Sequence, residues 1–196
     1  MRMIVVGATG TIGSEVVRAL SRKNHEVLPA SRASDLKVDL DNPASVRAMF
    51  EKAGGVDAVV SCTGNAAFKP FAELTDADYE LGLRSKMMGQ VLIARLAKDR
   101  LRDGGSITLT TGILAMRPMP GSASISMVNA GLEGFVRAAA LEMSRRIRIN
   151  AVSPPWVKET LVKLGMDAVS GLPSADVANA YVAAVEGTQQ GQILAP

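Results

Sequence analysis

The sequence predicts an α/β protein with one doubly wound parallel sheet and helices on both faces. Two observations support this fold class, and the chain length indicates the number of domains. Short apolar runs alternate with helical segments along the whole chain, which is the pattern of successive βαβ units. The first apolar run ends in glycines spaced three apart and is followed at once by a helical segment. The 196 residues suit one well-buried core, so we expect a single domain over residues 1–196.

The first expected strand is Met3–Val6, a continuous apolar run that ends at Gly7. An unbroken apolar run indicates a strand that is buried on both faces, as in a parallel sheet. The remaining expected strands, in chain order, are Glu26–Ala30, Leu36–Val38, Asp57–Cys62, Ser106–Thr110, Ile147–Val152 and Gln192–Leu194.

The segments between these runs have helical spacing, and several follow Ser, Asp or Asn-Pro start signals. Residues 154–173 are the least regular part, and we expect a loop or lid there with a short helix near Glu159–Leu164. The expected longer helices are Ile12–Leu20, Ala44–Lys52, Asp76–Asp99, Ser122–Arg145 and Ser174–Val185.

Composition excludes several functions. The 22 Lys and Arg exceed the 19 Asp and Glu by three, and they form no basic run, so no nucleic-acid partner is expected. One cysteine, Cys62, and one histidine, His25, cannot supply the ligand sets of most structural zinc sites, and we expect no metal. The apolar run at Met3 is too short for a signal peptide or a membrane span. We therefore expect a cytoplasmic protein without a membrane partner.

The segment Gly7–Gly13 carries the strongest local signal. Its glycines, Gly7, Gly10 and Gly13, lie between an expected strand and an expected helix, which is the context of a Rossmann-type nucleotide site. Glycines let the backbone approach a pyrophosphate closely, and the free amides and positive end of the helix attract the anion. The alternative is a tight strand-to-helix turn that binds no ligand. The expected cofactor contacts in this turn are Gly7, Thr9, Gly10, Thr11, Ile12 and Gly13.

Over nearly its whole length, the chain resembles the short-chain dehydrogenase/reductase family. The glycine block is similar to the family's, and Val38-Asp39-Leu40 stands where the family has an adenine-contacting Asp. Ser61-Cys62-Thr63-Gly64 ends the fourth strand where Asn-Asn-Ala-Gly is usual, and residues 148–157 with Thr160 resemble the segment that closes over the nicotinamide. The resemblance implies further cofactor contacts from Asp39, Leu40, Cys62, Thr63, Gly64, Asn129, Pro154, Val157 and Thr160.

The end of the second strand predicts the choice of cofactor. A carboxylate there favours NAD(H), whereas the 2′-phosphate of NADP(H) requires a cation. This chain has Ser31 and Arg32 at that place, a hydroxyl and a planar fork of donors, so we expect NADP(H). The alternative is that Arg32 is a solvated surface residue and that Asp35 takes the ribose.

The family's catalytic motif, Tyr-x-x-x-Lys, is absent. Alignment on the family's helix puts Ile125 at the Tyr position and Asn129 at the Lys position, and Gly112 stands where the carbonyl-polarising Ser is usual. Ile125 cannot transfer a proton, and a general acid contributes roughly a hundred- to ten-thousand-fold in rate. Thr111, one residue before Gly112, could substitute for the Ser. Lys86, which aligns with the relay Asn, is the expected acid because it would enter the same cleft; the alternative is an exposed lysine on a long helix.

Two functions therefore remain open. The first is an NADP(H)-dependent oxidoreductase for a small carbonyl or alcohol, with Lys86 and Thr111 as catalytic residues. The second is a non-catalytic NADP(H)-binding sensor or scaffold protein. In either case the resemblance implies a homodimer or homotetramer, because the family packs the helices that correspond to residues 76–99 and 122–145 across a two-fold axis.

Overall fold

The computed structural model describes residues 1–196 and contains one seven-stranded sheet with the order β3-β2-β1-β4-β5-β6-β7. Every neighbouring pair of strands is parallel. The strand order reverses direction between β1 and β4, which is the crevice where open α/β sheets bind ligands. The strands are β1 (Arg2–Val6), β2 (Glu26–Ser31), β3 (Leu36–Lys37), β4 (Val56–Ser61), β5 (Leu101–Thr110), β6 (Arg148–Val152) and β7 (Ile193–Leu194).

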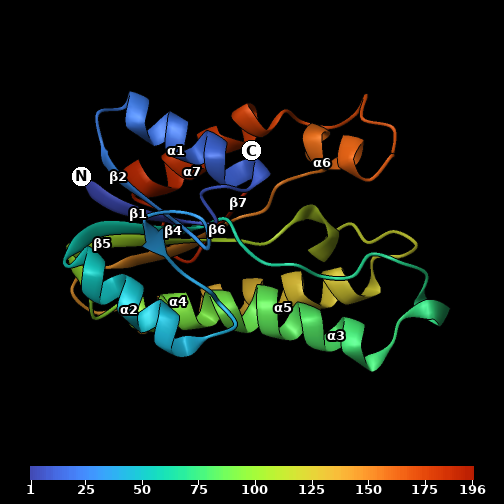
Figure 1. The fold of residues 1–196 in the computed structure, drawn as a ribbon, viewed down its shortest axis with the longest axis horizontal. Helices are drawn as coiled ribbons and strands as arrows, with labels where there is room; N and C mark the ends of the chain where they lie inside the picture. The colour runs from blue at the N-terminus through green and yellow to red at the C-terminus, as the bar shows by residue number, and fades with distance from the viewer.

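Helices cover both faces of the sheet (Figure 1). One face carries α1 and α7, which pack on each other, and the other carries α2, α4 and α5. The α-helices are α1 (Thr11–Arg22), α2 (Pro43–Ala53), α3 (Asp76–Gly82), α4 (Gly89–Ala97), α5 (Ala123–Ala140), α6 (Lys158–Lys163) and α7 (Ser174–Glu186). Short 3₁₀ turns occur at Phe71–Glu73 and Ile113–Ala115. No helix has both the length and the apolarity needed to cross a membrane.

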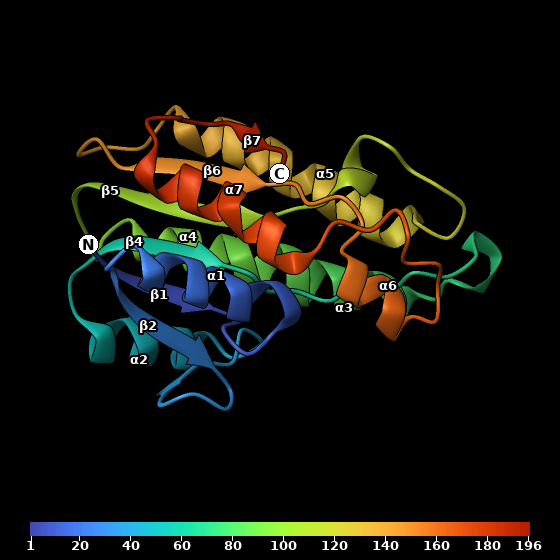
Figure 2. The ribbon, with the colours of Figure 1, turned by 90° about the horizontal axis from the view of Figure 1, so that it is seen from above.

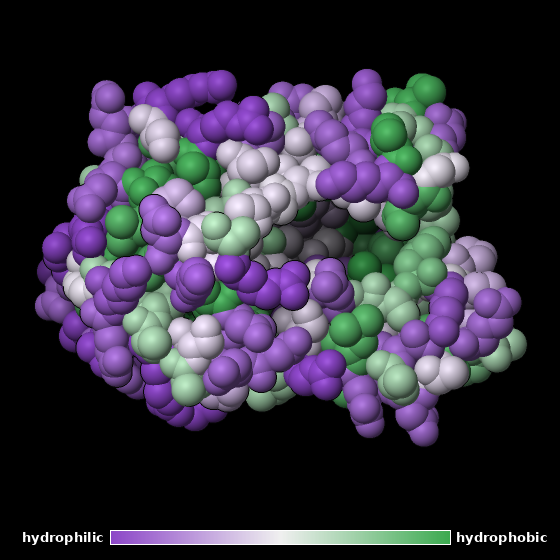
Figure 3. Space-filling view, viewed as in Figure 1, coloured by the Kyte–Doolittle hydropathy of each residue, from purple (hydrophilic) through white to green (hydrophobic).

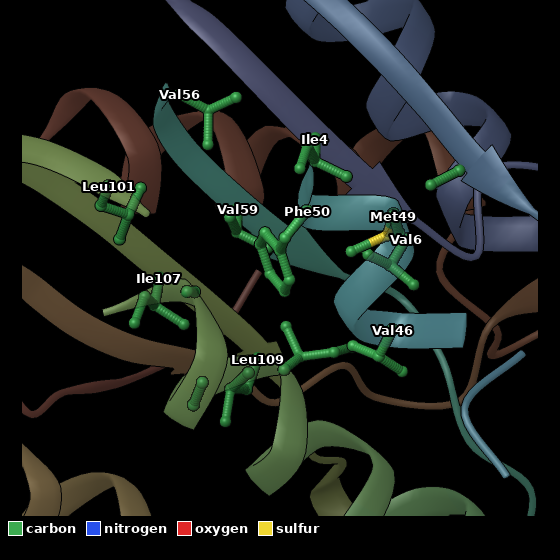
Figure 4. Packing of buried hydrophobic residues seen from close by; sticks show 14 of the residues in the cluster. Ile4, Val6, Val46, Met49, Phe50, Val56, Val59, Leu101, Ile107 and Leu109 are labelled. Carbon is green, nitrogen blue, oxygen red and sulfur yellow. The ribbon is translucent and has the colours of Figure 1, made fainter. Parts of the chain in front are cut away.

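The buried side chains form two hydrophobic cores, one on each face of the sheet. Strand β1 contributes to both, because successive side chains of a strand point to opposite faces. Met3 and Val5 pack with α1 and α7, whereas Ile4 and Val6 pack with α2 and α4. Figure 4 shows the second core, in which Phe50 and Met49 of α2 lie over the strands. The continuous apolar runs of the sequence thus correspond to strands that are buried on both faces.

Local sequence signals explain several helix starts. Asn42 caps α2, since its side-chain oxygen accepts a hydrogen bond from the Ala44 amide at 3.0 Å, and Pro43 occupies the first helical position. A capping box between Thr75 and Asp78 begins α3. These caps fix where both helices leave the carboxyl edge of the sheet.

All seven expected strands are present, but two expected helices differ from the prediction. The segment expected as one helix over residues 76–99 contains a π-helical segment, η2 (Leu83–Met88), between α3 and α4. The helix expected to reach Arg145 ends at Ala140. Its apolar spacing continues beyond that point, but Arg145 and Arg146 adopt left-handed conformations with φ of 53° and 57°, which form a turn into β6.

Candidate functional site

A cavity of about 390 Å³ lies at the carboxyl edge of the sheet, beside the crevice between β1 and β4. Because the strands are parallel, the loops that follow β1, β2, β3 and β4 all meet at this edge. The cavity is lined by Val6, Gly7, Thr9, Gly10, Ser31, Arg32, Ala33, Val38, Asp39, Leu40, Asp41, Cys62, Thr63, Gly64, Asn65 and Ser85.

The glycine turn after β1 is tightly packed. Gly7 has a φ of 82°, and a Cβ there would lie 2.5 Å from the Cys62 carbonyl oxygen. A Cβ on Gly13 would lie 2.1 Å from the Gly7 carbonyl oxygen, so only glycine brings α1 this close to the strand. Helix α1 has no side-chain cap at Gly10 and no acidic residue in its first turn. Its first amides and its positive end therefore face the turn uncompensated, as a phosphate site requires.

The loop after β2 places Arg32 on the cavity wall. Arg32 is exposed and Ser31 is buried. The Ser31 hydroxyl lies 2.7 Å from the Ser34 hydroxyl and accepts a hydrogen bond from the Ala33 amide, which shapes the loop. Asp35, the alternative ribose partner, does not line the cavity; its carbonyl accepts a hydrogen bond from Lys52.

Ten of the expected cofactor residues line this one cavity. Three more, Thr11, Ile12 and Gly13, form the first turn of α1. Asn129 lies on α5, and the segment that contains Pro154, Val157 and Thr160 follows β6 on the other side of the edge. The ten lining residues are Gly7, Thr9, Gly10, Ser31, Arg32, Asp39, Leu40, Cys62, Thr63 and Gly64.

Beyond the cavity, the loops after β4, β5 and β6 are joined by direct contacts. The rings of Phe68 and Trp156 meet edge to face with centroids 5.4 Å apart, and the Lys69 amide donates to the Gly121 carbonyl at 3.0 Å. Figure 3 shows a hollow on this side of the molecule, with hydrophobic side chains on its right-hand wall. An apolar space of this kind suits the carbon skeleton of a small substrate.

Lys86 lies in the π segment η2 and is 7 % exposed. Its Nζ donates to the Thr111 carbonyl oxygen at 3.2 Å. Burial lowers the pKa of Lys86 from 10.5 to about 8, because an ammonium loses its hydration in the interior. Its backbone is next to Gly64, which lines the cavity. The structure thus places a buried amine, able to change its protonation near neutral pH, behind the cavity wall.

Two residues that the sequence analysis did not single out hold the end of β5. Gln90, fully buried and one turn beyond Lys86, accepts from the Thr110 amide and donates to the Thr110 carbonyl, both at 2.8 Å. Tyr181 of α7 lies 2.7 Å from the Thr110 hydroxyl. Burial raises the pKa values of Tyr181 and Cys62, the latter to about 12. Only its spacing of four residues from Lys86 could have identified Gln90 from the sequence, because a buried glutamine has no distinctive sequence pattern.

Thr111 and Asn129 meet between β5 and α5. The Thr111 hydroxyl lies 3.5 Å from Glu133 Oε1 and 3.4 Å from the Val152 carbonyl oxygen. Both partners are acceptors, so the hydroxyl hydrogen points into the protein, and the Thr111 carbonyl is the group that contacts Lys86. Asn129 donates to the Gly112 carbonyl at 3.4 Å, and its buried Oδ1 has no hydrogen-bond partner. A buried acceptor without a partner is uncommon in folded proteins.

Glu133 is a further residue that sequence reasoning missed. It is 2 % exposed and lies four residues beyond Asn129, on the same face of α5. Its second oxygen pairs with Arg137 at 3.1 Å. A buried carboxylate needs such a partner, since an unpaired one is costly in the interior.

Comparison with known proteins agrees with this geometry. The model of a family described as Enoyl-(Acyl carrier protein) reductase matches residues 6–187. A hydroxynaphthalene reductase-like protein, Arp2, of Metarhizium brunneum is 37% identical over 134 residues, which cover 65% of this chain and 50% of that protein. The chain thus spans about half the length of the curated relatives it matches.

Solved structures are similar over the full chain. The crystal structure of the protein lin1944 from Listeria innocua is 41% identical with a TM-score of 0.94, covering 100% of this chain and 98% of that one. A small-chain dehydrogenase crystallised in complex with NADPH is 27% identical with a TM-score of 0.89, covering 100% and 96%. With a family model that matches most of its length, the chain belongs to the short-chain dehydrogenase/reductase family of oxidoreductases.

Proposed function

We propose that the protein is an NADP(H)-dependent oxidoreductase that acts on a small carbonyl or alcohol with an altered set of catalytic residues. The observation that carries the proposal is the position of Lys86, a buried amine with a pKa of about 8 behind the wall of a glycine-lined cavity. The reductase homologues and the NADPH complex of a 27% identical structure support the reaction class and the cofactor.

The residues around the cavity fit a dinucleotide. Side chains at Gly7 and Gly13 would collide with the backbone, and α1 presents unpaired amides to the turn. Arg32 offers a fork of donors for the 2′-phosphate. Asn129 Oδ1 lacks a donor, and a ribose hydroxyl would supply one. When bound, the cofactor supplies the hydride.

In the proposed mechanism, Lys86 gives the proton that a reduced carbonyl oxygen needs. Thr111 holds the Lys86 amine through its backbone carbonyl. Its hydroxyl polarises the substrate only after it turns away from Glu133. Ile125, at the family's acid position, has no proton to give, and burial excludes water from the Lys86 amine.

A binding experiment and a rate experiment test the proposal together. Titration should give tighter binding for NADPH than for NADH, and a panel of aldehydes and diones should show turnover with NADPH that falls as the pH rises through about 8. Lys86→Met should abolish turnover and leave the NADPH affinity within a few-fold. Equal affinities for the two cofactors, or turnover that survives Lys86→Met, would contradict the proposal.

The second candidate is a non-catalytic NADP(H)-binding protein. It is favoured by Ile125, which has no proton to transfer, and by Asn129, which lacks the positive charge of the family's Lys. A wild-type protein that binds NADPH and remains inert on the whole carbonyl panel would establish this candidate.

A further inference from the structure

A lysine of α6 reaches the start of α1. Lys163 Nζ donates to the Thr11 hydroxyl at 2.7 Å, although 152 residues separate them in the sequence. Thr11 is the first residue of α1, directly after the glycine turn. Figures 1 and 2 both place α6 at the carboxyl edge of the sheet, beyond the end of α1 that faces the turn.

This position is electrostatically unusual for a cation. The N-terminus of a helix carries partial positive charge, so it favours anions and disfavours an ammonium. Helix α1 makes the place less suitable still, since it has no acidic residue in its first turn and no side-chain cap. The lysine and the helix end become mutually compatible when an anion lies between them, because each then faces a negative charge.

The base of α6 is fixed while its far end is exposed. Lys158 and Leu172 are held together by a hydrogen bond of 2.9 Å from the Lys158 amide to the Leu172 carbonyl, and Glu159 accepts from the Ser174 amide at 3.0 Å. At the other end, Val162 and Leu164 are 63% and 53% exposed. Helix α6 is thus anchored at its N-terminal end, and its exposed C-terminal end presents Lys163 to the glycine turn.

We propose that Lys163 is a phosphate-binding residue that holds the 5′-diphosphate of the dinucleotide from the α6 side, opposite the amides of the glycine turn. The inference rests on the proposed cofactor site and adds to it a cation from a different part of the chain. Lys163 would exchange the Thr11 hydroxyl for a phosphate oxygen, with α6 already in place beside the start of α1. An ammonium facing a phosphate forms a charge-assisted hydrogen bond, which is stronger than the bond to a neutral hydroxyl.

Titration calorimetry of two nucleotides against variants of Lys163 and Lys158 tests the proposal. NADPH carries both the 2′-phosphate and the 5′-diphosphate, whereas adenosine 2′-monophosphate carries only the former. Lys163→Met should weaken NADPH about five- to tenfold, which is the scale of an exposed charge-assisted contact, and leave adenosine 2′-monophosphate unchanged. Lys163→Arg should restore most of the NADPH affinity. Lys158→Met is the matched control, because it removes the same charge from the exposed surface of the same helix.

The outcomes separate this inference from the proposed function. If Lys163→Met and Lys158→Met bind NADPH equally well, the phosphate role of Lys163 is wrong and the cofactor site stands. If Lys163→Met weakens both nucleotides alike, the lysine acts on the fold of the site and the proposal also fails. A wild-type protein that binds neither NADPH nor NADH overturns the proposed function and the Lys163 role with it.

Discussion

Gly64 and Lys86 touch so closely that no side chain fits between them: a Cβ on Gly64 would lie 2.5 Å from the Lys86 Cα and 2.6 Å from its Cβ. Gly64 also has a φ of 112°, which L side chains rarely adopt. The loop after β4 and the π segment η2 are therefore packed backbone to backbone at this point. This contact fixes how far Lys86 lies from the cavity.

Gly64→Ala should destabilise the protein by about 3 kcal/mol, because it adds steric overlap to an unfavourable φ. Gly104 provides the control, since it has a φ of 79° and nothing within 4 Å of an added Cβ. Gly104→Ala should therefore cost only the conformational strain, about 1 to 2 kcal/mol. Urea unfolding of both variants measures the difference. Equal losses of unfolding free energy in the two variants would contradict the prediction and would mean that the backbone around Lys86 shifts to accept the added Cβ.

The stability of the protein should rise with pH through the titration of Lys86. Its pKa is about 8 in the folded protein and 10.5 ordinarily, so between these values the unfolded chain binds more protons. The cost of burying the ammonium is present in full below pH 8 and is relieved as the pH rises toward 10.5. Relative to Lys86→Met, the free energy of unfolding of the wild type should increase by up to about 3 kcal/mol over this window. Urea unfolding at pH 7 and pH 10 provides the measurement, and parallel pH profiles would refute the shift.

Arg32→Ala should weaken NADPH by about tenfold or more and leave NADH unchanged, because only NADPH has a 2′-phosphate for the guanidinium to bind. Arg22→Ala, which removes an exposed cation at the other end of α1, is the control for a general change in charge. Titration of both cofactors against the three proteins decides the point. An NADPH affinity that falls equally in both variants would show that Arg32 acts only through the net charge.

Restoring the family's residues should create or raise NADPH-dependent carbonyl reduction. The Ile125→Tyr/Asn129→Lys double variant adds an acid and a ribose-holding amine to α5, where the hydride site and the cleft would already be in place. Initial rates with a reactive aldehyde or dione measure the gain. A wild type that is inert, together with an active double variant, would favour the binding-protein candidate over the enzyme.

The protein should be a homo-oligomer built on α4 and α5. Val91 and Leu92 of α4 and Phe135 of α5 are only partly buried in the single chain, and a helix pair of this kind gains by packing against a second copy. Light scattering at micromolar concentration should give at least twice the 20.5 kDa of one chain. Phe135→Glu should shift the population toward the single chain, and a wild-type mass of one chain would refute the prediction.

The spacing of the apolar residues and the positions of Gly and Pro predicted the succession of strands and helices along the chain. An unbroken apolar run such as Met3–Val6 can be buried only in a strand that lies between two helical layers. The tight turn between β1 and α1 was also predictable from the sequence, since the spacing of Gly7 and Gly13 allows a close approach of the backbone. The π segment η2 was not predicted. Its residues suit an ordinary helix, and the extra residue in the turn is accommodated by tertiary contacts such as Gly64 against Lys86.

The candidate site could be predicted only where residues act through the backbone or through a recognisable block. The contact of Lys163 with Thr11 joins segments that are 152 residues apart, and no periodicity connects them. Gln90 and Glu133 were hidden for a different reason: isolated polar residues on helices are usually solvated, and only the packing shows that these two are buried.

The π segment also determines how the chain would respond to the loss of a residue. A π turn contains one residue more than the α turn it replaces, so removing any one of Leu83–Met88 could restore an uninterrupted α-helix from Asp76 to Ala97. Such a deletion would spare the helical backbone yet rotate α3 and α4 relative to each other by about 100°. Deletion of Met87 or Met88, which lie between Lys86 and Gln90, would also change the phase of these two residues, so that they could not both keep their contacts with Thr111 and Thr110. Such a deletion would therefore disturb the contacts of the site more than the stability of the helix, because it changes the rotation of α3 relative to α4.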